Sequence, residues 1–203
     1  MKELSQTKLK KEIYKNILLN YPKAGKLFAE EWSKKLSKEL KKVLKGFEQT
    51  VDEKHPIFHL EYPLVSFSKI KCYYRIDKIR EYIEQGNFPI IYLPIERFIS
   101  NQDIKNNSYS KKENSRHIQF EFHYDSEYET ENIEPIYVMN CFSSGETVID
   151  GNHRVSFCKK KQIKNIPCIL LQEKEILSEK FYADKLGFLL AQFSKKLSEI
   201  PEE

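Results

Sequence analysis

The sequence predicts an α+β protein in which a small mixed β-sheet with flanking helices follows an N-terminal helical segment. Three observations support this class. Apolar residues recur at helical spacing through most of residues 1–50. Apolar and polar residues alternate over residues 118–123, as in a half-buried strand. Short apolar runs at 136–139 and 147–149 precede a glycine turn and a helix-like segment over residues 155–161.

The remaining elements follow from the same kinds of pattern. Helices are expected over residues 3–20, 23–47, 76–85 and 178–198, and strands over 88–93, continuing to 99, and over 166–171. Residues 49–68 contain two prolines and are interpreted as a connector with short extended pieces. The expected organisation is a helical N-terminal arm (1–50), a mixed α/β domain (51–175) and a C-terminal helix that packs on it (176–203).

Composition indicates a soluble globular protein. Of 203 residues, 40% are hydrophobic and 32% are charged, and no apolar run approaches the roughly 20 residues of a membrane span. The N-terminus lacks the apolar core of a signal peptide, so we expect a cytoplasmic protein without membrane association. The four cysteines show no Cys-x-x-Cys spacing and are expected to be free thiols.

Charge is distributed unevenly along the chain. Residues 1–50 hold 13 lysines, no arginine and six glutamates, a net charge of about +7 within a total of +4. Such a segment can face nucleic acid, but basic segments that grip nucleic acid usually use arginine as well. A solvated helical face is the alternative. The acidic residues 125–134 are interpreted as a loop, with Mg²⁺ binding as the alternative.

The strongest candidate site is the five-residue segment Asp150-Gly151-Asn152-His153-Arg154. A glycine turn that opens a helix presents N–H groups and the positive end of the helix dipole, which favour an anion. Arg154 can add a bidentate contact to a phosphate. In the structural alternative, Asp150 caps the helix and Arg154 pairs with an acid. No metal site is predicted, because His55 and His59 flank a proline and the two remaining strand histidines lack a cysteine or carboxylate pattern.

Residues 133–172 together resemble the ParB/sulfiredoxin superfamily. The resemblance rests on Pro135-Ile136-Tyr137-Val138, on the Asp-Gly-x-His-Arg turn at 150–154, and on the strand that starts near Pro167. Leu93-Pro94-Ile95-Glu96 is similar to the first conserved element of the family. The resemblance implies a compact mixed sheet with a nucleotide or phosphate pocket at the Gly151 turn.

Departures from the family pattern indicate which branch of the superfamily the chain resembles. Sulfiredoxins place a catalytic cysteine where this chain has Asn152, so their usual sulfinic-acid repair is not expected. Chromosome-partitioning ParB proteins have a more arginine-rich turn than this chain. The closest resemblance is to the Asp-Gly-x-His-Arg branch, which includes free serine kinases and ParB-like nucleases. It implies catalytic roles for Asp150 and Glu96, and nucleotide binding by Gly151, Asn152, His153 and Arg154.

The expected function is therefore a nucleotide- or phosphate-binding ParB-like protein, acting as a phosphotransferase or nucleotide hydrolase at this turn. Its expected ligands are ATP, ADP or CTP, with Mg²⁺. One alternative is a DNA-associated ParB-like nuclease or DNA-binding module that uses residues 1–50. A second alternative is a non-catalytic interaction protein on the same fold.

Overall fold

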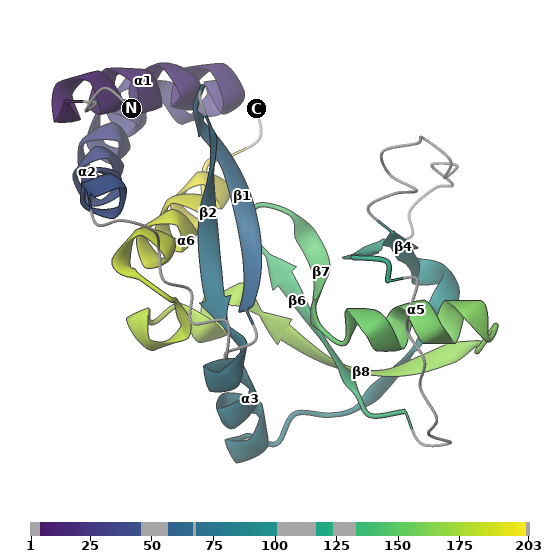
Figure 1. Ribbon diagram of the computed structural model, residues 1–203. Helices are drawn as coiled ribbons and strands as arrows, with labels where there is room; N and C mark the ends of the chain where they lie inside the picture. Colours follow the sequence, from purple (N-terminus) through teal and green to yellow (C-terminus); the bar gives the residue numbers. More distant parts are fainter. Residues whose placement is uncertain (1–4, 46–56, 67, 101–116, 124–132, 202–203) are drawn as a thin grey trace. The chain divides into compact units, whose positions relative to one another are not determined.

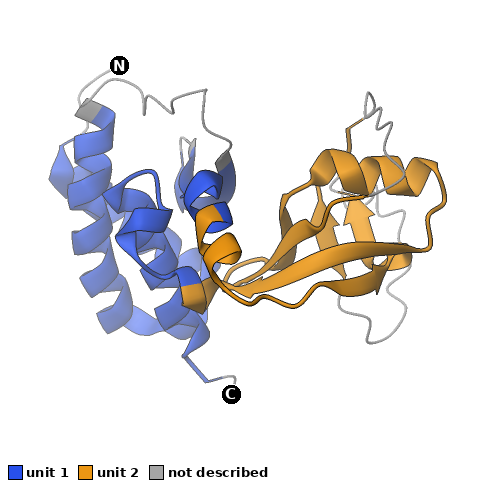
Figure 2. Cartoon of the chain, turned by 90° about the horizontal axis from the view of Figure 1, so that it is seen from below, with its two compact units in different colours: residues 1–80, 176–203 blue, residues 81–175 orange. Residues whose placement is uncertain are grey.

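The computed structural model describes residues 5–45, 57–66, 68–100, 117–123 and 133–201. The fold is α+β with two sheets, which confirms the predicted class (Figure 1). The chain forms two compact units, which Figure 2 colours blue and orange. We call residues 1–80 and 176–203 the helical unit, and residues 81–175 the sheet unit. Over the described ranges, every helix is too short or too polar to cross a membrane.

The helical unit contains three long helices and a β-hairpin. Its elements are α1 (Gln6–Asn20), the 3₁₀ turn η1 (Pro22–Ala24), α2 (Gly25–Lys45), β1 (Ile57–Val65), β2 (Ser68–Arg75), the 3₁₀ turn η4 (Glu179–Phe181) and α6 (Lys185–Ser198). Helix α3 (Ile76–Gln85) begins in this unit and ends in the sheet unit. The helices predicted over 3–20, 23–47, 76–85 and 178–198 are all present, with the last one shorter at its N-terminal end.

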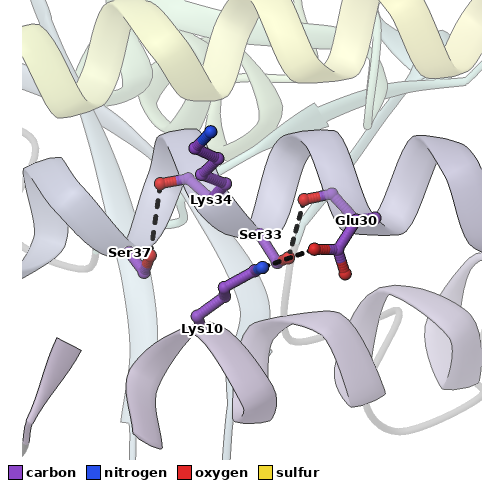
Figure 3. A network of polar contacts seen from close by, with 5 residues as sticks. All are labelled: Lys10, Glu30, Ser33, Lys34 and Ser37. Carbon is purple, nitrogen blue, oxygen red and sulfur yellow. Dashed lines mark hydrogen bonds and ion pairs between the residues drawn. The ribbon is translucent and has the colours of Figure 1, made fainter. Parts of the chain in front are cut away.

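Helices α1 and α2 pack against each other through a regular apolar pattern. The α1 side chains that recur every four residues are fully buried: Leu9, Ile13 and Ile17. On α2, the buried hydroxyls of Ser33 and Ser37 donate to the carbonyls of Glu30 and Lys34 on their own helix, at 3.1 and 3.2 Å. An ion pair between Lys10 and Glu30 joins the two helices at their surface (Figure 3). Small buried residues on α2 leave room for close helix packing.

Strands β1 and β2 form an antiparallel hairpin. Strand β1 lies in the segment predicted as a connector with short extended pieces, and β2 begins where that segment ends. Leu60, Tyr62 and Leu64 are buried and alternate with exposed neighbours, so β1 has the period of a half-buried strand. Pro63 is tolerated because the strand register shifts between Tyr62 and Val65. Helix α6 covers the hairpin, and Ser194 Oγ donates to the buried Tyr62 hydroxyl at 2.8 Å.

The sheet unit is built on one six-stranded mixed sheet. Its elements are β3 (Ile91–Pro94), the 3₁₀ turn η2 (Ile95–Arg97), β4 (Phe98–Ser100), β5 (Ile118–Phe120), β6 (Ile136–Cys141), β7 (Gly145–Asp150), α5 (Asn152–Lys160) and β8 (Asn165–Gln172), followed by the 3₁₀ turn η3 (Glu173–Ile176) at its end. The strand order is β3-β8-β6-β7-β5-β4. The predicted strands within 118–123, 136–139, 147–149 and 166–171 are confirmed, as is the helix after the glycine turn.

The predicted continuous strand over residues 88–99 is wrong. It begins only at Ile91, and η2 divides it into β3 and β4, which lie at opposite edges of the sheet. The N–H of Ile95 donates to the carbonyl of Lys164 at 2.9 Å, just after β3 has paired with β8. The chain then leaves β8 and pairs with β5 in a parallel direction.

An apolar cluster in the sheet unit contains two of the four cysteines. Cys158 from α5 and Cys168 from β8 are fully buried in the same apolar cluster as Phe98, Ile136 and Val155. All four cysteines of the chain are free, as predicted, and all four are buried. Burial raises the pKa of Cys158 to about 11 and that of Cys168 to about 12, and it also raises the pKa of Cys141. These thiols are protonated near neutral pH and are poor nucleophiles.

We expect the native protein to show no rapidly reacting thiol with an aromatic disulfide reagent at neutral pH. The same reagent is expected to titrate all four cysteines once the chain is unfolded in guanidinium chloride. The measurement compares the rate of thiol reaction in the native protein with the rate in the unfolded protein. A thiol that reacts within seconds in the native protein would contradict the buried placement and would reopen cysteine chemistry as a function.

Candidate functional site

The segment 150–154 lies where β7 ends and α5 begins. Gly151 is the N-cap residue of α5 and has a φ of 97°, in the left-handed region. A Cβ at this position would stand 2.6 Å from Cγ2 of Ile136, which is shorter than any tolerable contact. The N–H of Val155 donates to the carbonyl of Gly151 at 3.0 Å and closes the first helical turn. The turn therefore requires glycine for both its conformation and its space.

Arg154 turns its guanidinium toward the start of β6. Its Nη1 donates to the carbonyl of Pro135 at 2.8 Å and to that of Glu134 at 3.2 Å. The carboxylates of Asp150 and Glu134 each lie 3.5 Å from the guanidinium, and the residue is 8% exposed. Arg154 thus binds the end of β7 to the start of β6. Its ion pairs with Asp150 and Glu134 agree with the structural alternative, in which Arg154 pairs with an acid.

The side chains of Asn152 and Ser156 hold the segment that follows β5. Asn152 Oδ1 accepts a hydrogen bond from the backbone N–H of Glu121 at 2.9 Å. Ser156 Oγ accepts from the N–H of His123 at 3.0 Å and donates to the carbonyl of Asn152 at 2.9 Å. The first turn of α5 is therefore fastened to residues 121–123 by two side chains.

His153 and His123 form a stacked pair beside this turn. Their ring centroids lie 3.8 Å apart, with an angle of 20° between the planes. His153 is exposed and His123 is half-buried. The pKa of His153 is lowered below its usual 6.5, first by desolvation and then by the neighbouring His123, while the charge of Glu121 acts in the opposite direction. The charge of His123 therefore opposes protonation of His153.

We expect the imidazole of His153 to titrate below its usual pKa in an NMR titration of the folded protein. The substitution His123→Gln is expected to move this pKa upward, because one of the two lowering causes is removed. Since the folded pKa lies below the unfolded one, the stability contribution of neutral His153 is present above about pH 6.5 and is lost as the pH falls. His59→Gln, in β1, is the matched control and leaves the His153 titration unchanged. An unchanged His153 pKa in His123→Gln would contradict the stack.

Glu96 lies in η2 and is exposed. Within the described ranges its carboxylate makes no hydrogen bond or ion pair, although η2 lies against α5. The adjacent Arg97 donates to Glu146 at 2.7 Å and joins η2 to β7. The structure therefore places Glu96 near the helix without a contact to Asp150. Its role as a catalytic base stays a prediction.

Sequence reasoning missed the contacts that hold the turn. Glu121, His123 and Glu134 lie about 20 to 30 residues from it, and no local pattern linked them to it. Pro135 belongs to the resemblance motif, but its contact with Arg154 was not predicted. One sequence signal bore on these residues: the alternation of apolar and polar residues over 118–123 placed His123 on the polar face of the predicted strand. Of the acidic segment 125–134, only the last two residues are described, so Mg²⁺ binding there lies outside the described residues. No group of three metal-ligating side chains occurs in the ranges that the structure describes.

The lysines of α1 and α2 are partly neutralised. Lys10 pairs with Glu30, Lys35 with Glu31 at 2.6 Å, and Lys42 with Glu39 at 2.9 Å. The exposed Lys8, Lys11 and Lys15 recur at helical spacing along α1. These contacts fit a solvated helical face. Exposed lysines without an ion pair among the described residues remain on both helices: Lys8, Lys11 and Lys15 on α1, and Lys26, Lys34 and Lys38 on α2.

Taken together, the turn can offer an anion two kinds of group. One is the main chain at the start of α5, where the N-cap residue is a glycine and supplies no side-chain acceptor of its own. The other is the exposed imidazole of His153. The side chains of Asn152 and Arg154 are occupied by structural contacts.

Comparison of the chain with models of protein families, with curated proteins and with solved structures gives no match.

Proposed function

We propose that this chain is a ParB/sulfiredoxin-like protein that binds the phosphate groups of a nucleotide at the start of α5. The observation that carries the proposal is the junction of β7 and α5. Strands β4, β5 and β7 run parallel, so their carboxyl ends meet at the edge of the sheet where α5 begins. Open α/β sheets bind ligands outside the carboxyl ends of parallel strands, and a helix N-terminus favours a phosphate.

The contacts at the turn support a division of roles. The backbone N–H groups of the first turn and the His153 imidazole would contact the phosphate. Asn152 and Arg154 would act as positioning residues, because their side chains bind backbone groups of neighbouring segments. A lowered His153 pKa means that the free site holds a neutral imidazole near neutral pH, and a bound phosphate would raise that pKa.

Nearby carboxylates favour a nucleotide that arrives with Mg²⁺. The carboxylates of Asp150 and Glu134 share the charge of Arg154, and the charge of Glu121 acts on His153. Their negative charge opposes a free polyphosphate, whereas Mg²⁺ bridges carboxylate and phosphate oxygens. In this proposal Asp150 acts as the positioning carboxylate of a phosphotransferase or nucleotide hydrolase, since such catalysis is mostly positioning and charge neutralisation.

The test is a calorimetric titration of the full chain with ATP, ADP and CTP, each with and without Mg²⁺. We expect saturable binding of at least one nucleotide, stronger with Mg²⁺, and weaker by about tenfold in His153→Gln because a charge-assisted hydrogen bond is lost. His59→Gln makes the same chemical change in the helical unit and serves as the control. Failure of every nucleotide to bind the wild-type chain would remove the proposal. Equal binding by His153→Gln would place the nucleotide elsewhere.

A second candidate function is DNA binding through the helical unit. The observation in its favour is the exposed stripe of Lys8, Lys11 and Lys15 on α1. Replacing all three by glutamine is expected to abolish salt-dependent binding of a short duplex in a fluorescence anisotropy titration. Replacing the ion-paired Lys10, Lys35 and Lys42 is the matched control and is expected to have a smaller effect. Absence of binding at low salt would exclude this function.

A further inference from the structure

A pocket lies in the helical unit, between α2 and α6. Its volume is about 240 Å³, and it is open to solvent. Six residues line it: Trp32 and Lys35 from α2, Leu177 from the segment before η4, and Gln192, Lys195 and Lys196 from α6. The three α6 residues share one face of the helix because they are spaced three and four apart.

The apolar side of the pocket is held rigid by aromatic packing. Trp32 stands edge-on to Phe193 with ring centroids 5.6 Å apart, and Phe28 packs on both rings at 5.9 and 5.5 Å. Trp32 is 4% exposed, and Lys35 Nζ lies 4.7 Å from its ring centroid. The small surface of Trp32 that reaches the pocket therefore has a fixed position, next to a cation and to Leu177.

The charges at the pocket leave a net excess of one positive charge. Lys35 and Lys196 each pair with a glutamate, Glu31 and Glu199, at 2.6 Å. Lys195 is half-buried, and among the described residues no carboxylate pairs with it. Its charge nevertheless contributes to the lowered pKa of Glu199, after the larger effect of the Lys196 hydrogen bond. The ammonium of a half-buried lysine that no carboxylate pairs with, beside apolar carbon atoms, attracts an anion with an apolar body.

We propose that this pocket binds a small organic monoanion, with its carboxylate on Lys195 and its apolar body against Trp32 and Leu177. The volume decides the size of the ligand. A space of about 240 Å³ holds about eight water molecules, at ~30 Å³ each, and lies below the ~300–1,000 Å³ of drug-sized sites. A nucleotide is too large and too highly charged for it. Gln192 supplies a neutral amide that can bond the second carboxylate oxygen.

The chain itself contains the reporter for this proposal, because Trp32 is its only tryptophan. We expect sodium benzoate to change the tryptophan fluorescence of the full chain in a saturable way near neutral pH. Benzamide and benzylamine, which keep the ring and remove or reverse the charge, are expected to produce no saturable change. Lys195→Gln is expected to weaken benzoate binding about tenfold, and Lys195→Glu to abolish it.

Lys185→Gln is the matched control, since Lys185 is exposed at the start of the same helix and does not line the pocket. This variant is expected to bind benzoate as the wild type does. The proposal is overturned if benzamide binds as tightly as benzoate, if Lys195→Gln keeps the wild-type affinity, or if the wild-type fluorescence is unaffected by benzoate. Because α6 lies in the helical unit, none of these results depends on nucleotide binding by the sheet unit.

Discussion

Replacing Gly151 by alanine is expected to destabilise the sheet unit by about 3 kcal/mol. Two effects contribute. An L-residue at a φ of 97° is strained, and the added Cβ would lie 2.6 Å from Cγ2 and 3.0 Å from Cβ of the buried Ile136. Ile136 belongs to the core and to a strand that is paired on both sides, so it cannot move away without disturbing β6. The loss is measured by urea unfolding followed by circular dichroism.

Gly145→Ala is the matched control for this substitution. Gly145 also has a positive φ, of 71°, but a Cβ there would meet no atom within 4 Å. Both glycines lie in the sheet unit, at the two ends of β7. The control is expected to lose only the conformational part, about 1–2 kcal/mol. Equal losses in the two variants would show that the contact with Ile136 does not contribute.

The glycine turn could be predicted from sequence because its signals are local. Two short apolar runs, a glycine and a helix-like segment follow one another within about 25 residues, and the structure has β6, β7 and α5 there. Strand β5 was also predictable, since its two apolar residues alternate with a polar one and are buried. In each case the pattern that marks the element lies within the element itself.

The elements that sequence reasoning missed depend on distant parts of the chain. Residues 49–68 were interpreted as a connector with short extended pieces, but β1 is a nine-residue strand that accommodates Pro63 at a register shift and packs against α1. The break at η2 arises because β3 pairs with β8 and β4 with β5, which lie on opposite sides of the sheet order. Neither pairing has a signal in residues 88–99. Propensity indicates that these residues favour extended structure but not which strand each will join.

The same limit applies to the candidate site. The turn at 150–154 and the helix that follows it were predicted from the residue types, but the directions of the side chains were not. Arg154 was expected to face a phosphate, and in the structure it binds carbonyls of residues 134 and 135, which are brought close only when β6 pairs with β7. The side chain of Asn152 accepts a hydrogen bond from the backbone N–H of residue 121. This residue lies beside α5 because β5, which precedes it, pairs with β7. Sheet topology therefore decides which side chains remain available to a ligand.

Replacing Arg154 by methionine is expected to destabilise the sheet unit by about 3 kcal/mol in the absence of any ligand. The substitution keeps the apolar stem and removes the donors to the carbonyls of Glu134 and Pro135, as well as the cation beside Asp150. Arg154→Lys keeps the charge and is expected to recover only part of the loss, because an ammonium lacks the planar fork that reaches two carbonyls and a carboxylate together. Urea unfolding of the three proteins without nucleotide gives the comparison.

The Arg154 series also separates a positioning role from direct phosphate binding. If Arg154 positions the turn, both variants have a lower free energy of unfolding than the wild type in the absence of nucleotide. Arg154→Lys then weakens nucleotide binding only to the extent that it lowers this free energy. If Arg154 contacts phosphate directly, its free guanidinium contributes little to unliganded stability, and both variants unfold at the wild-type urea concentration while binding nucleotide poorly. The contacts of the guanidinium, which is 8% exposed, favour the first result. His153 then remains the side chain at this turn through which a bound phosphate would be recognised.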